Sequence, residues 1–267
     1  MTALAAKRRH PAAFAFLLLL ALLVTGTAYA AFAPRPAQAA TLGADQVVEG
    51  KKLFQANCST CHGLNAEGKS LGDGTEAGPA LAGVGASAVD FQMGTGRMPL
   101  AAPGIQAQRQ QKILFTPEQI SQVAAYIASL APGPAVPTSS DYDPATGNAA
   151  KGGALFRVNC AMCHNFAGSG GALTRGKYAP SLMGVAPKDV YEAMVTGPQS
   201  MPVFNDTNID PQGKRDIIAF LQTVHDSPTP GGMKLGALGP VSEGLFAWIF
   251  GLGILIGCAM WLGQKSA

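Results

Sequence analysis

Between its two ends, the chain carries apolar residues at the spacing of amphipathic α-helices. The clearest stripe follows Thr116-Pro117-Glu118-Gln119, which is typical of a helix start because the threonine can cap the helix and the glutamine can complete a capping box. Further helices are predicted over residues 45–57 and from Asp210-Pro211 onward. The apolar positions are Val47, Val48, Leu53 and Phe54, then Ile120, Val123, Ala124, Ile127 and Leu130, and finally Ile217, Phe220, Leu221 and Val224. No strand pattern competes with them, so the predicted fold is mainly α.

Both ends of the chain carry long uncharged apolar runs. The first, residues 12–33, follows a basic cluster and precedes Ala37-Gln38-Ala39-Ala40, which fits a cleavage site. It predicts either a signal peptide or a membrane-anchoring signal helix within residues 1–44. The second run, residues 245–262, has a tryptophan near each end and predicts a transmembrane helix over 244–263 rather than a buried soluble helix.

The charges predict an orientation and exclude one class of function. Basic residues lie before the first apolar run, and Lys265 lies after the last. The positive-inside rule therefore places both ends in the cytoplasm and the rest on the extracytoplasmic side of the plasma membrane. The formal net charge is +3, but residues 1–44 hold four basic residues and no acidic one, which leaves −1 for the remainder. This charge gives no reason to expect nucleic-acid binding.

A short motif, C-x-x-C-H, occurs twice between the two apolar runs. It is the attachment signal for a c-type haem, in which two thiols add to the haem vinyl groups and the adjacent imidazole becomes the first axial iron ligand. Two copies in similar surroundings predict two covalently bound haem c groups. The residues concerned are Cys58, Cys61 and His62 in the first copy, and Cys160, Cys163 and His164 in the second.

The same cysteines have other uses in proteins. Two C-x-x-C pairs can build one four-thiolate zinc site, and each pair can form a disulfide or a redox-active dithiol. Haem is favoured because a histidine directly follows each pair and the chain carries features of export. The fifth cysteine, Cys258, lies in the C-terminal apolar run and is expected to pack as a small hydrophobic residue.

The surroundings of the two motifs repeat, which predicts two domains built from one template. The matching segments are residues 50–58 with 152–160, residues 78–84 with 179–185, and Thr95-Gly96-Arg97-Met98-Pro99 with Thr196-Gly197 and Met201-Pro202. The first copy is longer, because 28 positions separate Met98 from Tyr126, whereas 19 separate Met201 from Phe220.

Stretches rich in proline and glycine separate these units. The predicted order is a leader over residues 1–44, a first domain over 45–130, a linker over 131–147, a second domain over 148–226, a linker over 227–243 and the transmembrane helix over 244–263. Each domain is small for a self-sufficient hydrophobic core, so a covalently held haem would supply apolar filling.

A methionine is predicted to complete each haem site opposite the histidine, because electron-transfer haems usually have both axial positions occupied. Met98 and Met201 are assigned because they match in the repeat and each precedes a proline. The remaining candidates are expected to fill the core: Met93, Met162, Met183 and Met194. His225 is expected at the surface, with a bis-histidine haem as its alternative role. Pro79 and Pro180 either accept a hydrogen bond from the motif histidines or are simple turn residues.

Several of these segments together resemble a known family. They are residues 95–99, 159–166, 170–173, 176–180, 195–202 and 239–244. They look like parts of tandem class I cytochrome c domains. The whole arrangement resembles the di-haem cytochrome c subunit of the actinobacterial menaquinol–cytochrome c reductase, the cytochrome bc complex.

The resemblance implies a relay. A cytochrome b subunit oxidises quinol, a Rieske iron–sulfur protein passes the electron to this chain, and this chain passes it to a terminal cytochrome oxidase. The sequence offers no catalytic residue for quinol, so the reductase activity belongs to the assembly and this chain is its electron carrier. The alternatives are a subunit of another periplasmic oxidase or dehydrogenase, a free carrier without a C-terminal helix, a peroxidase with an open iron site, or a zinc-stabilised interaction protein.

Overall fold

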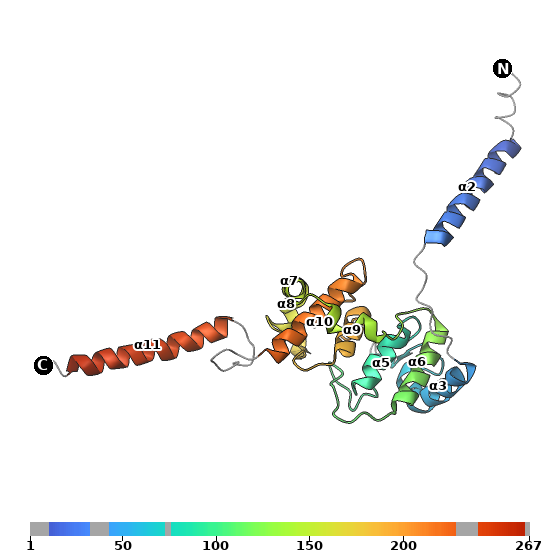
Figure 1. The fold of residues 1–267 in the computed structure, drawn as a ribbon. Helices are drawn as coiled ribbons and strands as arrows, with labels where there is room; N and C mark the ends of the chain where they lie inside the picture. The colour runs from blue at the N-terminus through green and yellow to red at the C-terminus, as the bar shows by residue number, and fades with distance from the viewer. Residues whose placement is uncertain (1–10, 33–42, 73–75, 228–239, 265–267) are drawn as a thin grey trace, which may run out of the picture. The chain divides into compact units, whose positions relative to one another are not determined.

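The computed structural model describes residues 11–32, 43–72, 76–227 and 240–264. Its ribbon is drawn in Figure 1. The chain divides into two units, and helix α2 (Pro11–Phe32) is the described element of the first. The second unit contains two helical domains and ends in helix α11 (Pro240–Gln264).

The first domain is assembled from four helices and one short strand pair. Its elements are α3 (Ala44–Asn57), α4 (Ser59–His62), β1 (Lys69–Ser70), β2 (Glu76–Gly78), α5 (Gly85–Gly94) and α6 (Pro117–Leu130). The helix predicted over residues 45–57 is thus confirmed, with one more residue at its start. The capping box of α6 is also confirmed, because the Gln119 N–H donates to Thr116 Oγ1 over 3.2 Å and the Thr116 N–H donates to Gln119 Oε1 over 3.0 Å.

The second domain repeats this order. Its elements are the 3-10 turns η1 (Ser139–Asp141), η2 (Pro144–Thr146) and η3 (Thr174–Gly176), the helices α7 (Ala149–Asn159), α8 (Ala161–His164), α9 (Pro187–Thr196) and α10 (Pro211–Asp226), and the strands β3 (Gly171–Ala172) and β4 (Tyr178–Ala179). Asp210 caps α10 as predicted, with its side chain accepting from the Gly213 N–H over 2.7 Å. The repeat in the sequence is therefore a repeat in the fold.

In each domain, the helix before the C-x-x-C-H motif crosses the last helix of the domain at a glycine. A Cβ on Gly50 would overlap the backbone carbonyl of Gln122, and one on Gly152 would overlap that of Asp216. The absent side chains allow α3 to approach α6, and α7 to approach α10, backbone to backbone. Beside each crossing two aromatic rings pack: Phe54 on Tyr126 at 5.4 Å, and Phe156 on Phe220 at 5.3 Å between centroids.

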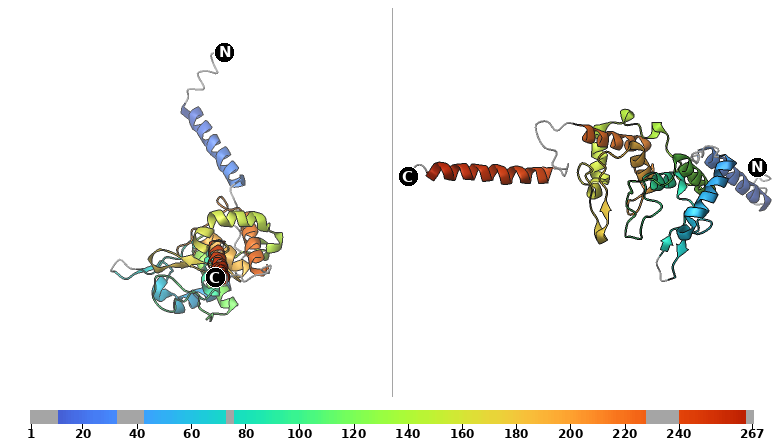
Figure 2. Two further views of the ribbon diagram at one scale, coloured as in Figure 1. Left: turned by 90° about the vertical axis from the view of Figure 1, so that its left-hand side faces the viewer. Right: turned by 90° about the horizontal axis from the view of Figure 1, so that it is seen from below.

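The two short strand pairs were not predicted. β1 pairs with β2 and β3 with β4, both antiparallel, and the strands are drawn as arrows in the right-hand view of Figure 2. A strand of two or three residues is too short to show an alternating pattern, so the sequence gives no signal for it. Both pairs lie between the motif histidine and the proline predicted to support it.

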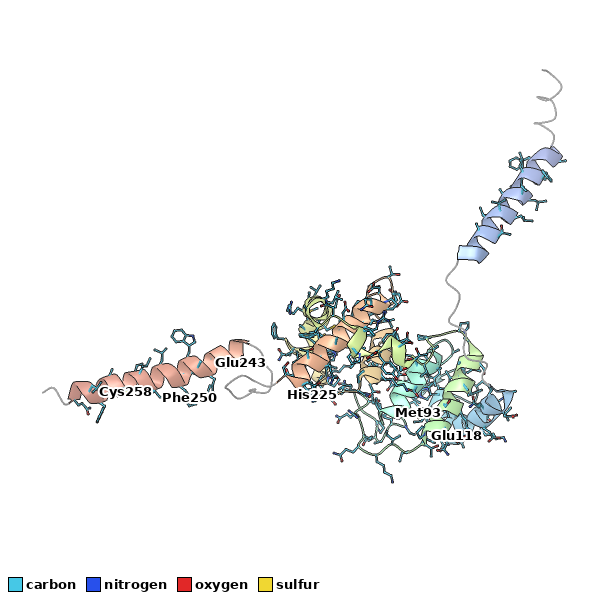
Figure 3. The ribbon with its side chains drawn as sticks, viewed as in Figure 1. Met93, Glu118, His225, Glu243, Phe250 and Cys258 are labelled. Atoms are coloured by element: carbon cyan, nitrogen blue, oxygen red, sulfur yellow. The ribbon has the colours of Figure 1, made fainter. Side chains whose placement is uncertain are left out.

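Helix α11 carries the predicted transmembrane segment. Residues Ser242–Gln264 are long and apolar enough to cross a membrane, and none of the most apolar window is buried in the protein. Glu243, Phe250 and Cys258 are labelled along this helix in Figure 3. In α2, the apolar stretch with described side chains, Phe14–Ala28, is shorter than a span requires. An N-terminal anchor therefore stays a prediction, and the proposed cleavage site lies outside the described residues.

Candidate haem sites

Each C-x-x-C-H motif folds into one tight helical turn. The Cys58 carbonyl accepts hydrogen bonds from the Cys61 N–H at 3.2 Å and the His62 N–H at 3.0 Å. The second motif repeats this arrangement, with the Cys160 carbonyl accepting from Cys163 at 3.1 Å and from His164 at 2.9 Å. Residues three and four positions apart on a helical turn share one face, so both thiols and the imidazole can address a single flat group.

The backbone fixes the orientation of both motif histidines. The Nδ1–H of His62 donates to the Pro79 carbonyl over 2.8 Å, and the Nδ1–H of His164 donates to the Pro180 carbonyl over 2.9 Å. Of the two roles that the sequence left open for these prolines, the structure shows the hydrogen-bond acceptor. Because Nδ1 carries the proton, Nε2 keeps the lone pair that an iron ligand needs. Burial also lowers the pKa of His164, despite the opposing hydrogen bond to Pro180, and so favours the neutral, ligating imidazole.

The first thiol of each motif lies in an apolar environment, which suits a neutral thioether better than a thiolate. Burial, followed by the neighbouring Cys61, raises the pKa of Cys58 to about 11. Burial and the neighbouring Cys163 likewise raise the pKa of Cys160 to about 12. A zinc site needs thiolates, which this environment disfavours, whereas a thioether sulfur is neutral.

The two cysteine pairs do not converge. None of the four motif cysteines forms a disulfide, and the described part of the chain contains no group of three or more Cys, His, Asp or Glu side chains that could hold one metal ion. Each pair instead adjoins its own hydrophobic core, with Cys58 packed against the first core and Cys160 within the second. The donor sets therefore fit two separate haem groups.

Each assigned methionine lies in the loop that follows the helix after the strand pair. Met98 packs, half-buried, against the core that Cys58 adjoins, and Met201 packs against the core that contains Cys160. Their loops are fastened to the preceding helices, since the Met98 N–H donates to the Gln92 carbonyl over 2.9 Å and the Phe204 N–H donates to the Met194 carbonyl over 2.8 Å. Each site thus gathers a motif turn and a methionine loop around one core.

The remaining methionines lie in other environments. Met93, labelled in Figure 3, and Met194 are 5% and 2% exposed inside their cores. Met183 is half-buried. Met162 is 90% exposed within the second motif, so the prediction that it fills the core is wrong. Its position between the two cysteines of a helical turn points its side chain outward.

His225 lies at the end of α10, as Figure 3 shows. It is exposed, as predicted, and its Nδ1 lies 2.9 Å from Asp226 Oδ1. Its ring borders a small cavity lined by Leu182, Gly184 and Val190, among others.

The sequence reasoning missed the polar residues that join the two domains. Lys188 on α9 forms an ion pair with Asp90 on α5. The Gln106 side chain hydrogen-bonds the backbone of Tyr178. The signal for the Gln106 contact was the greater length of the first copy of the repeat after Met98, and the Lys188–Asp90 pair had no signal in the repeat.

Comparison with known proteins agrees with this geometry. Residues 47–131 match the cytochrome c family, and residues 147–221 match the family described as cytochrome c oxidase, cbb3-type, subunit III. Two such domains imply haem c binding.

Whole-length relatives identify the family. A cytochrome bc1 complex cytochrome c subunit of Corynebacterium efficiens is 42% identical over 97% of this chain and 91% of its own length. The subunits of the same description from Corynebacterium diphtheriae and Mycobacterium tuberculosis are 39% and 42% identical over 97% and 94% of this chain, and over 96% and 90% of their own lengths. Likeness of this extent, together with two cytochrome c domains and a C-terminal apolar helix, shows that the chain belongs to the family of cytochrome bc1 complex cytochrome c subunits.

Proposed function

We propose that this chain is the membrane-anchored carrier of two covalently bound haem c groups in a menaquinol–cytochrome c reductase. In this role it takes electrons from the cytochrome b and Rieske core and passes them to a terminal oxidase. The observation that carries the proposal is the duplicated site: two motif turns, each with its histidine oriented by a proline carbonyl, in a chain whose whole-length relatives are bc1 complex subunits.

The chain's own side chains have distinct tasks in this proposal. Cys58, Cys61, Cys160 and Cys163 attach the two haems through thioethers, while His62, Met98, His164 and Met201 provide the axial positions. A c-type haem with such ligands supplies an iron that takes up and releases one electron. Hydrogen bonds from Nδ1 to the carbonyls of Pro79 and Pro180 hold each imidazole in the ligating tautomer.

Membrane attachment would keep both haem domains close to their redox partners. We propose haem domains over residues 45–130 and 148–226, on the extracytoplasmic side, tethered by α11. A tether raises the effective concentration of a carrier near its partners, so no diffusing cytochrome is needed between the two redox steps. In this proposal the chain is an electron carrier, and the reductase activity belongs to the assembly.

A second candidate function follows from the match of residues 147–221 to an oxidase subunit family. In that case the chain would serve an oxidase or a periplasmic dehydrogenase directly. The likeness to bc1 complex subunits over nearly the whole chain favours the reductase.

Affinity purification of the chain from its native membranes tests both functions. Haem spectra and protein identification are recorded on the same sample. Co-purified b-type haem, a Rieske protein and oxidase subunits are the result expected of the relay. A two-haem protein that co-purifies with a dehydrogenase alone, or with nothing, would contradict it.

A further inference from the structure

The first domain is longer than the second between the axial methionine and the last helix. Residues 99–116 separate Met98 from α6, whereas residues 202–210 separate Met201 from α10. Much of the longer loop is exposed, and Ile105 and Leu114 are 64% and 65% exposed. Ala107 differs, because it is 7% exposed and lies in a part of the loop that contacts the second domain.

One glutamine makes a two-point contact from this loop. Gln106 Nε2 donates to the Tyr178 carbonyl over 2.8 Å, and the Tyr178 N–H donates to Gln106 Oε1 over 3.0 Å. A primary amide carries a donor and an acceptor at the spacing of a peptide group, so Gln106 pairs with β4 as a neighbouring strand would. Within the strand pair, Tyr178 of β4 lies opposite Ala172 of β3.

A second contact reaches the methionine loop of the second domain. The Ala107 N–H donates to Gln199 Oε1 over 3.2 Å. Gln199 has φ of 60°, a left-handed conformation that a non-glycine residue keeps only where its surroundings hold it. It lies two residues before Met201.

Both contacts fall on segments that carry the second haem site. Tyr178 lies two residues before Pro180, whose carbonyl orients His164. Gln199 belongs to the loop of Met201, the other residue assigned to the second site. The residues that hold these two segments come from the loop that follows Met98, the assigned ligand of the first site.

We propose that residues 105–107 form an interdomain strap, in which Gln106 is a positioning residue that braces the segment before Pro180 against the first domain, while the Ala107 N–H braces the Met201 loop. This inference rests on the proposed function, since it takes His164 and Met201 as iron ligands. In this proposal, the longer loop of the first domain keeps the two haem sites in a fixed position relative to each other.

A separate contact holds the two domains together when the hydrogen bonds of the strap are lost. α5 packs against α9, and Lys188 pairs there with Asp90. Replacing Gln106 should therefore release the Tyr178 segment, which leads to Pro180 and so to His164, without separating the domains. The Gln106→Ala variant is therefore expected to stay folded, so that the loss of the strap contact can be measured.

The test compares Gln106→Ala and Gln106→Glu with Gln108→Ala in the full haem-loaded chain in detergent. Gln108 is an exposed glutamine of the same loop, and its replacement is the matched control. Glutamate keeps an acceptor for the Tyr178 N–H but sets its second carboxylate oxygen against the Tyr178 carbonyl, so it should also accelerate exchange. Hydrogen exchange of peptides that contain Tyr178 and Met201 is the first readout, and thermal fading of the methionine–iron band of the second haem is the other.

In Gln106→Ala, exchange of the Tyr178 peptide should accelerate roughly ten- to thirtyfold, the effect of losing two hydrogen bonds. The methionine–iron band of the second haem should fade at a lower temperature, and Gln108→Ala should match the wild type in both. Equal exchange in Gln106→Ala and Gln108→Ala would overturn the strap. Absence of covalent haem from the wild type would instead overturn the proposed function, while the exchange data would still report on the strap.

Discussion

Glu192 lies fully buried at the contact of α9 with α5, and its Oε1 is 4.0 Å from the Nζ of Lys188. No N–H or O–H of the described residues donates to the carboxyl oxygens of Glu192, and the polar group that shares a hydrogen bond with its protonated form is the Asp90 carboxylate. Burial, followed by the charge of Asp90, raises the pKa of Glu192 to about 9, although Lys188 opposes the shift. Burial lowers the pKa of Lys188, but its hydrogen bond to Asp90 and the charge of Glu192 outweigh this and raise it. The interface therefore holds one ion pair, Lys188 with Asp90, beside a carboxylic acid that is neutral at pH 7.

The first prediction concerns the pH dependence of this interface. The folded chain keeps the Glu192 proton up to a pH of about 9, whereas the unfolded chain loses it near the ordinary value of 4.5. The unfolded state then binds fewer protons between these values, so the contribution of Glu192 to stability falls as pH rises from about 4.5 to about 9. Glu192→Gln cannot ionise and should be more stable than the wild type at pH 8, by about 1–3 kcal/mol.

Thermal unfolding of the two proteins across pH 5 to 9 measures this difference. Subtracting one curve from the other removes the contribution of groups that titrate in the same way in both proteins. A difference that does not widen with pH would show that Glu192 ionises as an ordinary surface carboxyl group.

Local sequence was sufficient to predict the parts of the fold that depend on local contacts. The motif turns, the capping box at Thr116 and the start of α10 at Asp210 each rest on contacts within four residues. The two-domain order followed from the repeat. The histidine–proline hydrogen bonds were also within reach, because the same proline recurs after each motif.

The contacts between the domains could not be predicted in this way. Gln106 and Tyr178 are 72 positions apart, and nothing in the repeat brings them together because the second copy lacks the loop. Lys188 and Glu192, four positions apart on a helix, have the pattern of an exposed ion pair, yet Glu192 is 0% exposed. α5 was also missed, since its first turn of small residues has no side-chain cap. Non-local burial of polar groups leaves little trace in a single sequence.

The second prediction concerns the crossing of α7 and α10. Gly152→Ala would force a Cβ into the Asp216 carbonyl, and backbone atoms at this crossing cannot turn aside. The free energy of unfolding of the second domain should fall by about 1–3 kcal/mol or more. Gly153→Ala is the control, because its Cβ would meet the Phe220 ring at 3.0 Å, which is a side chain that can move. Denaturant unfolding followed by haem absorbance measures both, and equal losses would contradict the close crossing.

The third prediction concerns haem attachment. Cys160→Ala combined with Cys163→Ala removes both thiols of the second motif, so the purified chain should carry one covalent haem instead of two. Cys258→Ala, on α11, should retain both. Denatured haem spectra per mole of protein and the intact mass provide the count. Two covalent haems in the double variant would refute attachment through the second motif.

The fourth prediction separates the assigned ligand of the first site from its nearest competitor. Met98 is half-buried in a loop, whereas Met93 is 5% exposed inside α5. Replacing Met98 should therefore change the haem spectrum, and replacing Met93 should change the stability. Met98→Ala should abolish the methionine–iron band of one haem and lower its reduction potential, because a thioether ligand favours ferrous iron. Met93→Ala should leave that band in place and instead cost about 2–5 kcal/mol of stability through the cavity it creates. Redox titration with absorption spectra reads the first effect and denaturant unfolding the second. If the band survives in Met98→Ala and disappears in Met93→Ala, the axial ligand lies on α5, and the match of Met98 with Met201 in the repeat does not identify it.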